Sequence, residues 1–173
     1  MRKYLMRFQR LSVVLIALAT IVPQGTRGQA REQTAFSAED AGMKNPVALP
    51  ADVLEALKSD SFASDAFRQE VPASCFSASA IRLGPRVDDL IVEAEGVLRG
   101  ANVNMFWVFL TTPSGHRLVL KAPAHDLIVE NARTHEYRDI TTRYATAGAA
   151  TTENLRFNGK EYALHHRKTE AVR

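Results

Sequence analysis

The chain has 173 residues, of which 22 are Lys or Arg, 19 are Asp or Glu, and 46% are hydrophobic. This composition is typical of a globular domain and excludes a disordered or fibrous chain. Five basic residues and no acidic residue stand in the first thirty positions, so 17 basic residues face 19 acidic ones after Ala30. The formal charge of +3 therefore comes from the leader. The rest of the chain lacks the concentrated positive surface that phosphate binding needs, so we do not expect nucleic acid as a partner.

The first thirty residues predict a secretory signal peptide. Cations in residues 1–10 are followed by the apolar run 11–22 and then by small residues up to Ala30. The run is shorter than the roughly twenty residues that a membrane-spanning helix needs. We therefore expect residues 1–30 to be removed, a periplasmic or extracellular location, and no permanent membrane anchor after processing. The single cysteine, Cys75, cannot form a disulfide within the chain, and we expect it to be a small buried residue.

The chain after the leader divides into two parts. Residues 31–48 are polar and show little periodicity, so we expect a flexible N-terminal segment there. Residues 49–173 are expected to form a single globular β-rich domain. It opens with apolar residues at helical spacing after Pro50, which predicts a short amphipathic helix. A similar pattern over residues 62–70 favours a second brief helix, which Pro72 ends.

After Pro72 the sequence changes to short segments rich in β-branched and aromatic residues, separated by turn residues. We expect strands at residues 76–83, 89–94, 105–112, 116–121, 127–131, 137–144, 154–157 and 161–165. The clearest turn signal is Asn158-Gly159, which favours a tight hairpin with a type I′ turn. Together these patterns predict an α+β fold: an antiparallel β-meander sheet or a small sandwich, with one or two short N-terminal helices.

Two stretches of the strand region follow the same order of features. Each has an aspartate followed by an aliphatic residue, a long loop, an aromatic strand, a turn glycine and a closing strand. The corresponding residues are Asp89, Phe109 and Gly115 in one stretch and Asp139, Phe157 and Gly159 in the other. Two such units cannot close a propeller, so two quasi-repeats in a twisted sheet or small sandwich are expected. The alternative is a chance similarity between two pairs of hairpins.

Several of these segments resemble a group of secreted bacterial proteins of undefined function. In that group a loop similar to the loop of FG-GAP and VCBS modules precedes an Asp-Leu-Ile-Val strand, in the pattern D-x-N-x-D-G-x-x-D-L-I-V. The resemblance spans residues 76–162. The segments that carry it are residues 76–83, 87–92, 100–102 with 106–109, 137–140 and 157–162.

The resemblance implies a calcium loop, because carboxylate and amide oxygens of such loops hold Ca²⁺. In this chain, however, Arg82 and Arg86 stand where acidic residues would be required. The remaining pair, Asp88 and Asp89, cannot supply six or more oxygen ligands. We therefore expect no calcium, no other metal and no cofactor. We expect Asp89 to bind backbone groups at the start of its strand instead.

The sequence shows no motif for nucleophilic or metal chemistry, so no catalytic residue is assigned. The serines lack a Gly-x-Ser-x-Gly elbow, and no glycine run forms a phosphate cradle. Glu93 and Glu95 share one strand face, and we expect them on a solvated outer face and not in a catalytic pair. The histidines lack metal-ligand spacing and are expected at or near the surface: His116, His125, His135, His165 and His166.

The candidate binding surface combines a polar loop with an aromatic residue: Arg99, Asn102, Asn104 and Trp107. Residues 99–104 contain one cation, two amides and a flexible glycine. Such loops recognise polar partners, although many simply turn the chain. The aromatic run 106–109 fits a strand that is buried on both faces. The alternative leaves Trp107 exposed as a platform for stacking on a sugar or a peptide.

These observations favour a secreted, non-enzymatic binding or envelope-associated protein whose sheet recognises an envelope protein or polysaccharide. Two alternatives stay open. One is a small envelope-acting hydrolase with Asp88, Asp89 or a histidine as acid or base, and the other is a purely structural envelope protein. A cleft in which titratable side chains converge would favour the hydrolase. An exposed aromatic residue or a flat polar patch would favour binding.

Overall fold

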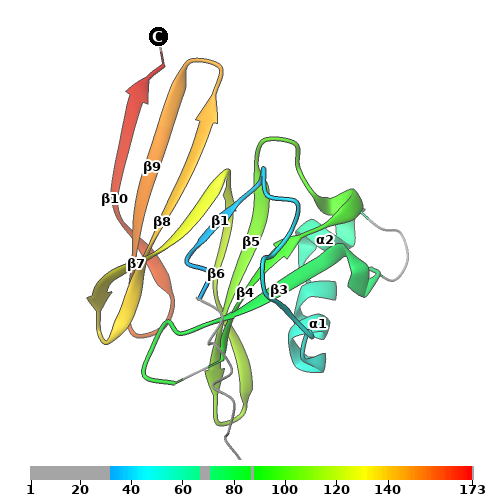
Figure 1. Cartoon of the computed structure of the whole chain (residues 1–173). Helices are drawn as coiled ribbons and strands as arrows, with labels where there is room; N and C mark the ends of the chain where they lie inside the picture. Colours follow the sequence, from blue (N-terminus) through cyan, green and yellow to red (C-terminus); the bar gives the residue numbers. More distant parts are fainter. Residues whose placement is uncertain (1–31, 67–70, 87, 173) are drawn as a thin grey trace, which may run out of the picture.

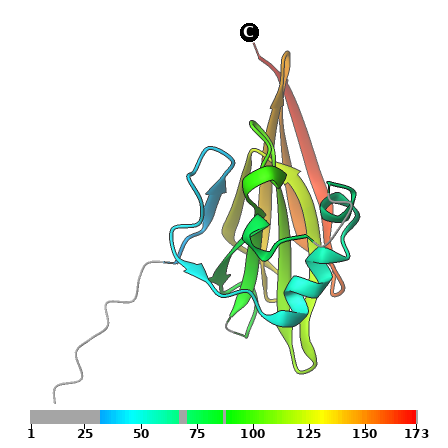
Figure 2. The ribbon, with the colours of Figure 1, turned by 90° about the vertical axis from the view of Figure 1, so that its right-hand side faces the viewer.

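The computed structural model describes residues 32–66, 71–86 and 88–172. The predicted signal peptide, residues 1–30, and residues 67–70 of the second expected helix lie outside the described residues. Two five-stranded antiparallel sheets pack against each other, with two short helices against one of them (Figures 1 and 2). The prediction of an α+β fold with a small antiparallel sandwich is confirmed. In the described part of the chain, no helix has the length and apolar content that would let it cross a membrane.

The two sheets follow the chain as two meanders. The first, called here the β3–β6 sheet, has the order β2 (Pro46–Val47), β3 (Phe76–Ile81), β4 (Asp89–Ala94), β5 (Asn104–Thr112), β6 (Gly115–Ala124). The second, the β7–β10 sheet, has the order β1 (Ala35–Ser37), β7 (Asp126–Thr134), β8 (Tyr137–Thr146), β9 (Ala149–Phe157), β10 (Tyr162–Ala171). Only His125 separates β6 from β7, so the chain passes directly between the sheets. The two predicted quasi-repeats correspond to β4–β6 and β8–β10.

The main core lies between the two sheets, and both contribute large buried residues to it: Ile91, Phe106 and Val108 from one, Leu127, Ile140 and Leu155 from the other. A second cluster lies on the opposite face of the β3–β6 sheet, under α1 (Ala51–Lys58) and α2 (Ser61–Ala66). Val53 and Leu57 of α1 are fully buried there, as the helical spacing predicts. Cys75 is buried in the same cluster, also as predicted. Because both faces of the sheet are covered, β4 shows an unbroken apolar run over residues 90–92.

The N-terminal segment is part of the sandwich, so the prediction of a flexible segment over residues 31–48 is wrong for its described part. Residues Ala35–Ser37 form β1 and pair with β7, and β2 pairs with β3. Phe36 and Met43 are buried in the main core. Phe36 and Met43 are seven positions apart in a polar segment, so they produce no periodic pattern in the sequence. Each nevertheless buries apolar surface, which stabilises the position of the segment.

The hairpin at Asn158 forms, but its turn differs from the predicted type I′. Phe157 pairs with Tyr162, so the loop has four residues and not two. The Asn158 side-chain oxygen accepts the backbone N–H groups of Lys160 and Glu161, both at 2.9 Å. This side chain organises the turn, and the strand pairing begins two residues later than expected. Gly159 has a φ of 97°, which agrees with the predicted positive value.

Candidate functional site: a groove between the sheets

A groove of about 370 Å³ opens between the end of the β3–β6 sheet and the inner face of the β7–β10 sheet. This volume falls in the range of small-ligand pockets, which is about 300 to 1,000 Å³. Five of the nine lining residues are aliphatic or proline, and only three carry a charge. We call it the intersheet groove. Its lining residues are Val103, Leu120, Lys121, Ala122, Pro123, Tyr144, Glu153, Leu155 and Arg167.

One wall of the intersheet groove is the edge of β6. Four consecutive residues, 120–123, line it. Successive side chains of a strand point to opposite faces, so four in a row reach one groove only when the strand presents its edge. β6 is the last strand of its sheet, which leaves that edge without a neighbouring strand. Pro123 fits this position because proline is tolerated at a sheet edge.

The other wall is the inner face of the β7–β10 sheet. Tyr144 comes from β8, Glu153 and Leu155 from β9, and Arg167 from β10. Glu153 and Leu155 are two positions apart and so share one face of the sheet. Arg167 lies directly opposite Glu153 in the β9–β10 ladder. Leu155 also belongs to the main core, so the groove is an extension of the space between the sheets.

Every charged residue that lines the groove has a partner of opposite charge. The Glu153 Oε1 atom lies 2.7 Å from Nε and 2.6 Å from Nη2 of Arg167. The Nζ atom of Lys121 lies 2.8 Å from Oδ1 of Asp60 in the segment between α1 and α2. The Lys121 pair lies on the helix side of the sheet, so a charged ligand in the groove would have to displace Glu153 or Arg167 from its partner. The groove is therefore best suited to an uncharged and mainly apolar ligand, with the Tyr144 hydroxyl as a polar contact.

Trp107 is not available as a stacking platform. Its side chain is fully buried, and its ring packs against Phe62 and Phe76 with centroid distances of 6.0 and 5.6 Å. The strand alternation directs it to the helix side of the β3–β6 sheet, where α2 covers it. The aromatic run is therefore core, and the interpretation of Trp107 as an exposed binding residue is corrected.

The polar residues of the predicted surface are mostly engaged inside the protein. Asn104 is fully buried, and its Nδ2 donates to the carbonyl of Ala94 at 3.0 Å. Arg99 is half-buried and binds the N-terminal segment through the carbonyl of Ala38 at 2.9 Å. Only Asn102 of the four predicted residues is exposed. Arg99 and Asn104 thus hold the fold together, because their donors satisfy backbone acceptors.

The prediction that Glu93 and Glu95 lie on a solvated outer face is wrong. Glu93 is 2% exposed and points to the inner face of β4, where its Oε1 has no hydrogen-bond partner among the described residues. Burial, and then the charge of the neighbouring Glu95, raise the pKa of Glu93 to about 7. The charge of Asp40 in the N-terminal segment also raises this pKa, and Arg99 binds that segment through the carbonyl groups of Ala38 and Asp40. A carboxylic acid that keeps its proton to near neutral pH tolerates this burial.

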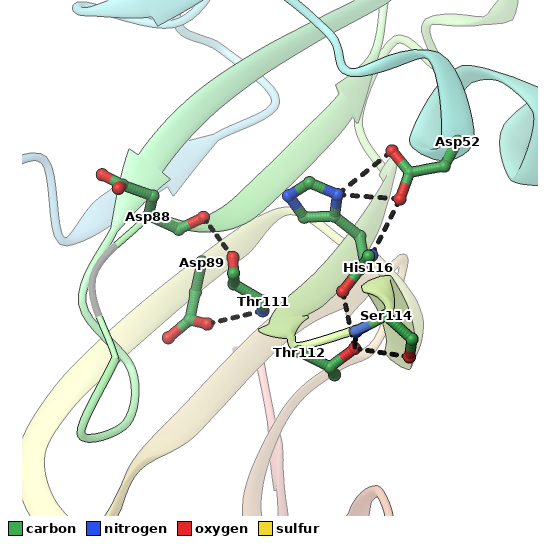
Figure 3. A network of polar contacts seen from close by, with 8 residues as sticks. Asp52, Asp88, Asp89, Thr111, Thr112, Ser114 and His116 are labelled. Carbon is green, nitrogen blue, oxygen red and sulfur yellow. Dashed lines mark hydrogen bonds and ion pairs between the residues drawn. The ribbon is translucent and has the colours of Figure 1, made fainter.

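Figure 3 shows a polar network at the opposite end of β4, and it confirms the predicted role of Asp89. Oδ2 of Asp89 accepts the backbone N–H groups of Leu83 and Gly84 at 3.1 and 3.2 Å. Oδ1 accepts the N–H of Thr111 at 2.9 Å. The carboxylate that the resemblance would assign to a calcium loop therefore binds backbone groups. In the described part of the chain, no three His, Cys, Asp or Glu side chains gather as a metal site would require.

The same figure shows an Asp52–His116 pair that joins α1 to β6. The Nδ1 atom of His116 lies 3.0 Å from Oδ2 of Asp52, which also accepts the His116 backbone N–H at 2.8 Å. These bonds, the backbone one first, lower the pKa of Asp52. The Ser114 hydroxyl is bonded to Thr112 Oγ1 at 3.2 Å, on the turn. The pair holds α1 on the β3–β6 sheet.

Sequence reasoning did not find the groove, because its walls come from residues that are far apart in the chain: 103, 120–123, 144, 153, 155 and 167. One signal was present. Pro123 stands in a segment with strand character, and proline within such a segment indicates an edge strand. That signal predicts a free edge on β6 but not the wall that faces it.

Comparison of the chain with protein-family models, with curated proteins and with solved structures finds no significant match. The resemblance to modules of the FG-GAP and VCBS type stays a prediction. The function is therefore argued from the geometry of the intersheet groove.

Proposed function

We propose that this chain is a secreted, non-enzymatic binding protein whose intersheet groove holds an uncharged, mainly apolar ligand of the cell envelope. The observation that carries the proposal is the groove itself, which combines aliphatic walls with charged residues that are already paired. Apolar surface that leaves water on binding provides the driving force. The leader sequence supports the secreted location.

The groove chemistry favours an apolar molecule, or an apolar segment of an envelope protein, over a polysaccharide. A sugar chain brings many hydroxyl groups, each of which needs a polar partner when it is buried. Tyr144 is the only uncharged polar side chain in the groove lining. The Asp52–His116 pair lies on the helix side of the β3–β6 sheet and does not line this groove. A hydrolase would need the reverse, with titratable groups converging on the binding cavity.

A fluorescence titration with the uncharged probe N-phenyl-1-naphthylamine tests the proposal. We expect saturable binding to the wild-type protein. Replacing Val103 by Asp puts a carboxylate on an aliphatic wall, and we expect at least a tenfold increase in Kd, since burying an unpaired charge is costly. The matched control is Val97→Asp, at a valine that is 79% exposed outside the groove. Unchanged affinity in Val103→Asp would overturn the assignment of the groove.

A further inference from the structure

The backbone of β6 carries unpaired hydrogen-bonding groups along the intersheet groove. β5 pairs with one edge of β6 from Gly115 to Ala124, and β6 ends its sheet. The consecutive residues 120–123 show that the free edge, and not only alternate side chains, borders the groove. A free strand edge is a template for pairing with another extended chain.

Pro123 indicates which backbone groups point into the groove. A proline nitrogen has no hydrogen to donate, so in a paired strand it points away from the neighbouring strand. The neighbour of β6 at this position is Met105 of β5, so the Pro123 nitrogen points to the free edge. The backbone N–H and C=O groups of every second residue in a strand point to the same edge, so the Lys121 N–H points to the free edge as well. The Lys121 side chain lies elsewhere, against Asp60 and Phe62.

The space beside this edge is bounded by a sheet face that the β3–β6 sheet does not cover. In Figure 1 the distal parts of β8, β9 and β10 project past the end of β6. Residues 167–171 of β10 are all exposed, whereas Leu155, at the base of this region, is buried. An additional strand beside β6 would extend the β3–β6 sheet over this face. Its alternate side chains would then contact Leu155 and Tyr144.

We propose, on the basis of the proposed function, that the occupant of the intersheet groove is an extended, uncharged and mainly apolar segment of another protein that binds as an added strand on β6. One of its carbonyl groups accepts the backbone N–H of Lys121, and its own N–H groups donate to the carbonyl groups of Lys121 and Pro123 at the same edge, none of which a lipid chain would pair. Its side chains carry no charge, because Glu153 and Arg167, the charged side chains that face the groove, already pair with each other. Pro123 ends the pairing, because the residue opposite it finds no donor.

Two labelled peptides of the sequence Ser-Val-Ala-Val-Ala-Val-Ser test the proposal by fluorescence polarisation. The first has an ordinary backbone, and in the second every Val and Ala nitrogen is methylated. Methylation removes the donors of the strand and adds apolar surface, so the two peptides separate strand pairing from apolar contact. We expect the ordinary peptide to bind saturably and to displace N-phenyl-1-naphthylamine. We expect the methylated peptide to bind at least tenfold more weakly.

Variants at Lys121 test the same strand pairing from the side of the protein, by removing or keeping its backbone N–H. Lys121→Pro removes the N–H that faces the groove, and we expect at least a tenfold loss of peptide affinity. Lys121→Ala loses the same side-chain contacts but keeps the N–H, so it is the reference for the proline variant, and we expect Lys121→Pro to bind the peptide at least tenfold more weakly than Lys121→Ala. Hydrogen exchange on the wild-type protein does not depend on how the variants fold, and the ordinary peptide should slow exchange of the Lys121 amide.

The results separate two claims: that the groove binds an apolar ligand, and that this ligand is a peptide strand added to β6. Equal affinity of the two peptides, with no slowing at Lys121, overturns strand addition while probe binding preserves the proposed function. Binding of the probe without binding of either peptide has the same meaning. If neither the probe nor a peptide binds, the proposed function fails as well.

Discussion

Glu93 is a buried carboxyl group on the inner face of β4, the face on which Ile91 contributes to the main core. The charges that act on it are Glu95 and Asp40, which raise its pKa, and Arg99, which lowers it. Burial raises the pKa most, to about 7, against 4.5 for an ordinary glutamate. The folded protein therefore binds a proton on Glu93 that the unfolded chain loses at lower pH.

This difference predicts how stability depends on pH. The contribution of protonated Glu93 is fully present below pH 4.5 and is lost as the pH rises to about 7, so the free energy of unfolding should fall across this window. Gln keeps the shape and stays neutral, so Glu93→Gln should remove this slope and be more stable than wild type above pH 7 by about 2 kcal/mol, after allowance for solvent screening at Glu95. Urea unfolding at pH 5, 6, 7 and 8 measures both curves.

The control for Glu93 is Glu170→Gln. Glu170 is exposed on β10 and pairs with Lys168 at the surface, so its removal should leave the pH slope as in wild type. Parallel curves for Glu93→Gln and wild type would contradict the buried and protonated state of Glu93.

At the scale of elements, the hairpin between β9 and β10 closes the β7–β10 sheet through a loop that depends on Gly159. Its φ of 97° lies in a region that side chains with a branched β-carbon rarely adopt. Gly159→Val should therefore cost on the order of 1–3 kcal/mol of stability through backbone strain. Chemical denaturation of the variant and the wild type measures this cost.

Gly148, in the turn between β8 and β9, provides the matched control. Its φ lies outside the left-handed region, and a Cβ there meets no atom within 4 Å, so Gly148→Val should be near neutral. Equal stability of Gly159→Val and wild type would show that this turn does not constrain the sheet.

The elements that the sequence predicts well are those with a local signal. β-Branched and aliphatic content predicts strands such as β4 and β8, and helical spacing predicts α1, because each pattern reports burial within the element itself. The prediction fails where burial depends on distant elements. β1 forms because β7 offers an edge, and Glu93 is buried although its own segment predicts an exposed face. The turn at Asn158-Gly159 differs for another reason. The Asn158 side chain binds the backbone N–H groups of Lys160 and Glu161, and a four-residue loop forms in place of the type I′ turn.

The candidate site was less predictable than the fold. Its walls join the edge of β6 to the inner face of three strands that follow much later in the chain, and only Pro123 marks that edge in the sequence. The residues predicted for binding were chosen for local composition. Asn104 and Trp107 are buried instead, because the amide satisfies the backbone of β4 and the ring packs under the helices.

At the scale of the whole molecule, the proposed location depends on removal of the leader. The apolar run at residues 11–22, followed by small residues up to Ala30, predicts a mature N-terminus near Arg31. Intact-mass measurement of the exported protein should give the mass of a chain that begins there. A mass that retains residues 11–22 would contradict both the processing and the secreted, unanchored state.

The proposed ligand site lies where the two sheets separate, between the edge of β6 and the β7–β10 sheet. The most direct test is a titration of the isotope-labelled protein with N-phenyl-1-naphthylamine, followed by NMR at each backbone amide. We expect saturable shifts that concentrate on Val103, on residues 120–122 and on Glu153 and Leu155, with Asp52 and His116 unchanged. Shifts confined to the helix side of the β3–β6 sheet, or no saturable shift at all, would contradict the proposed site.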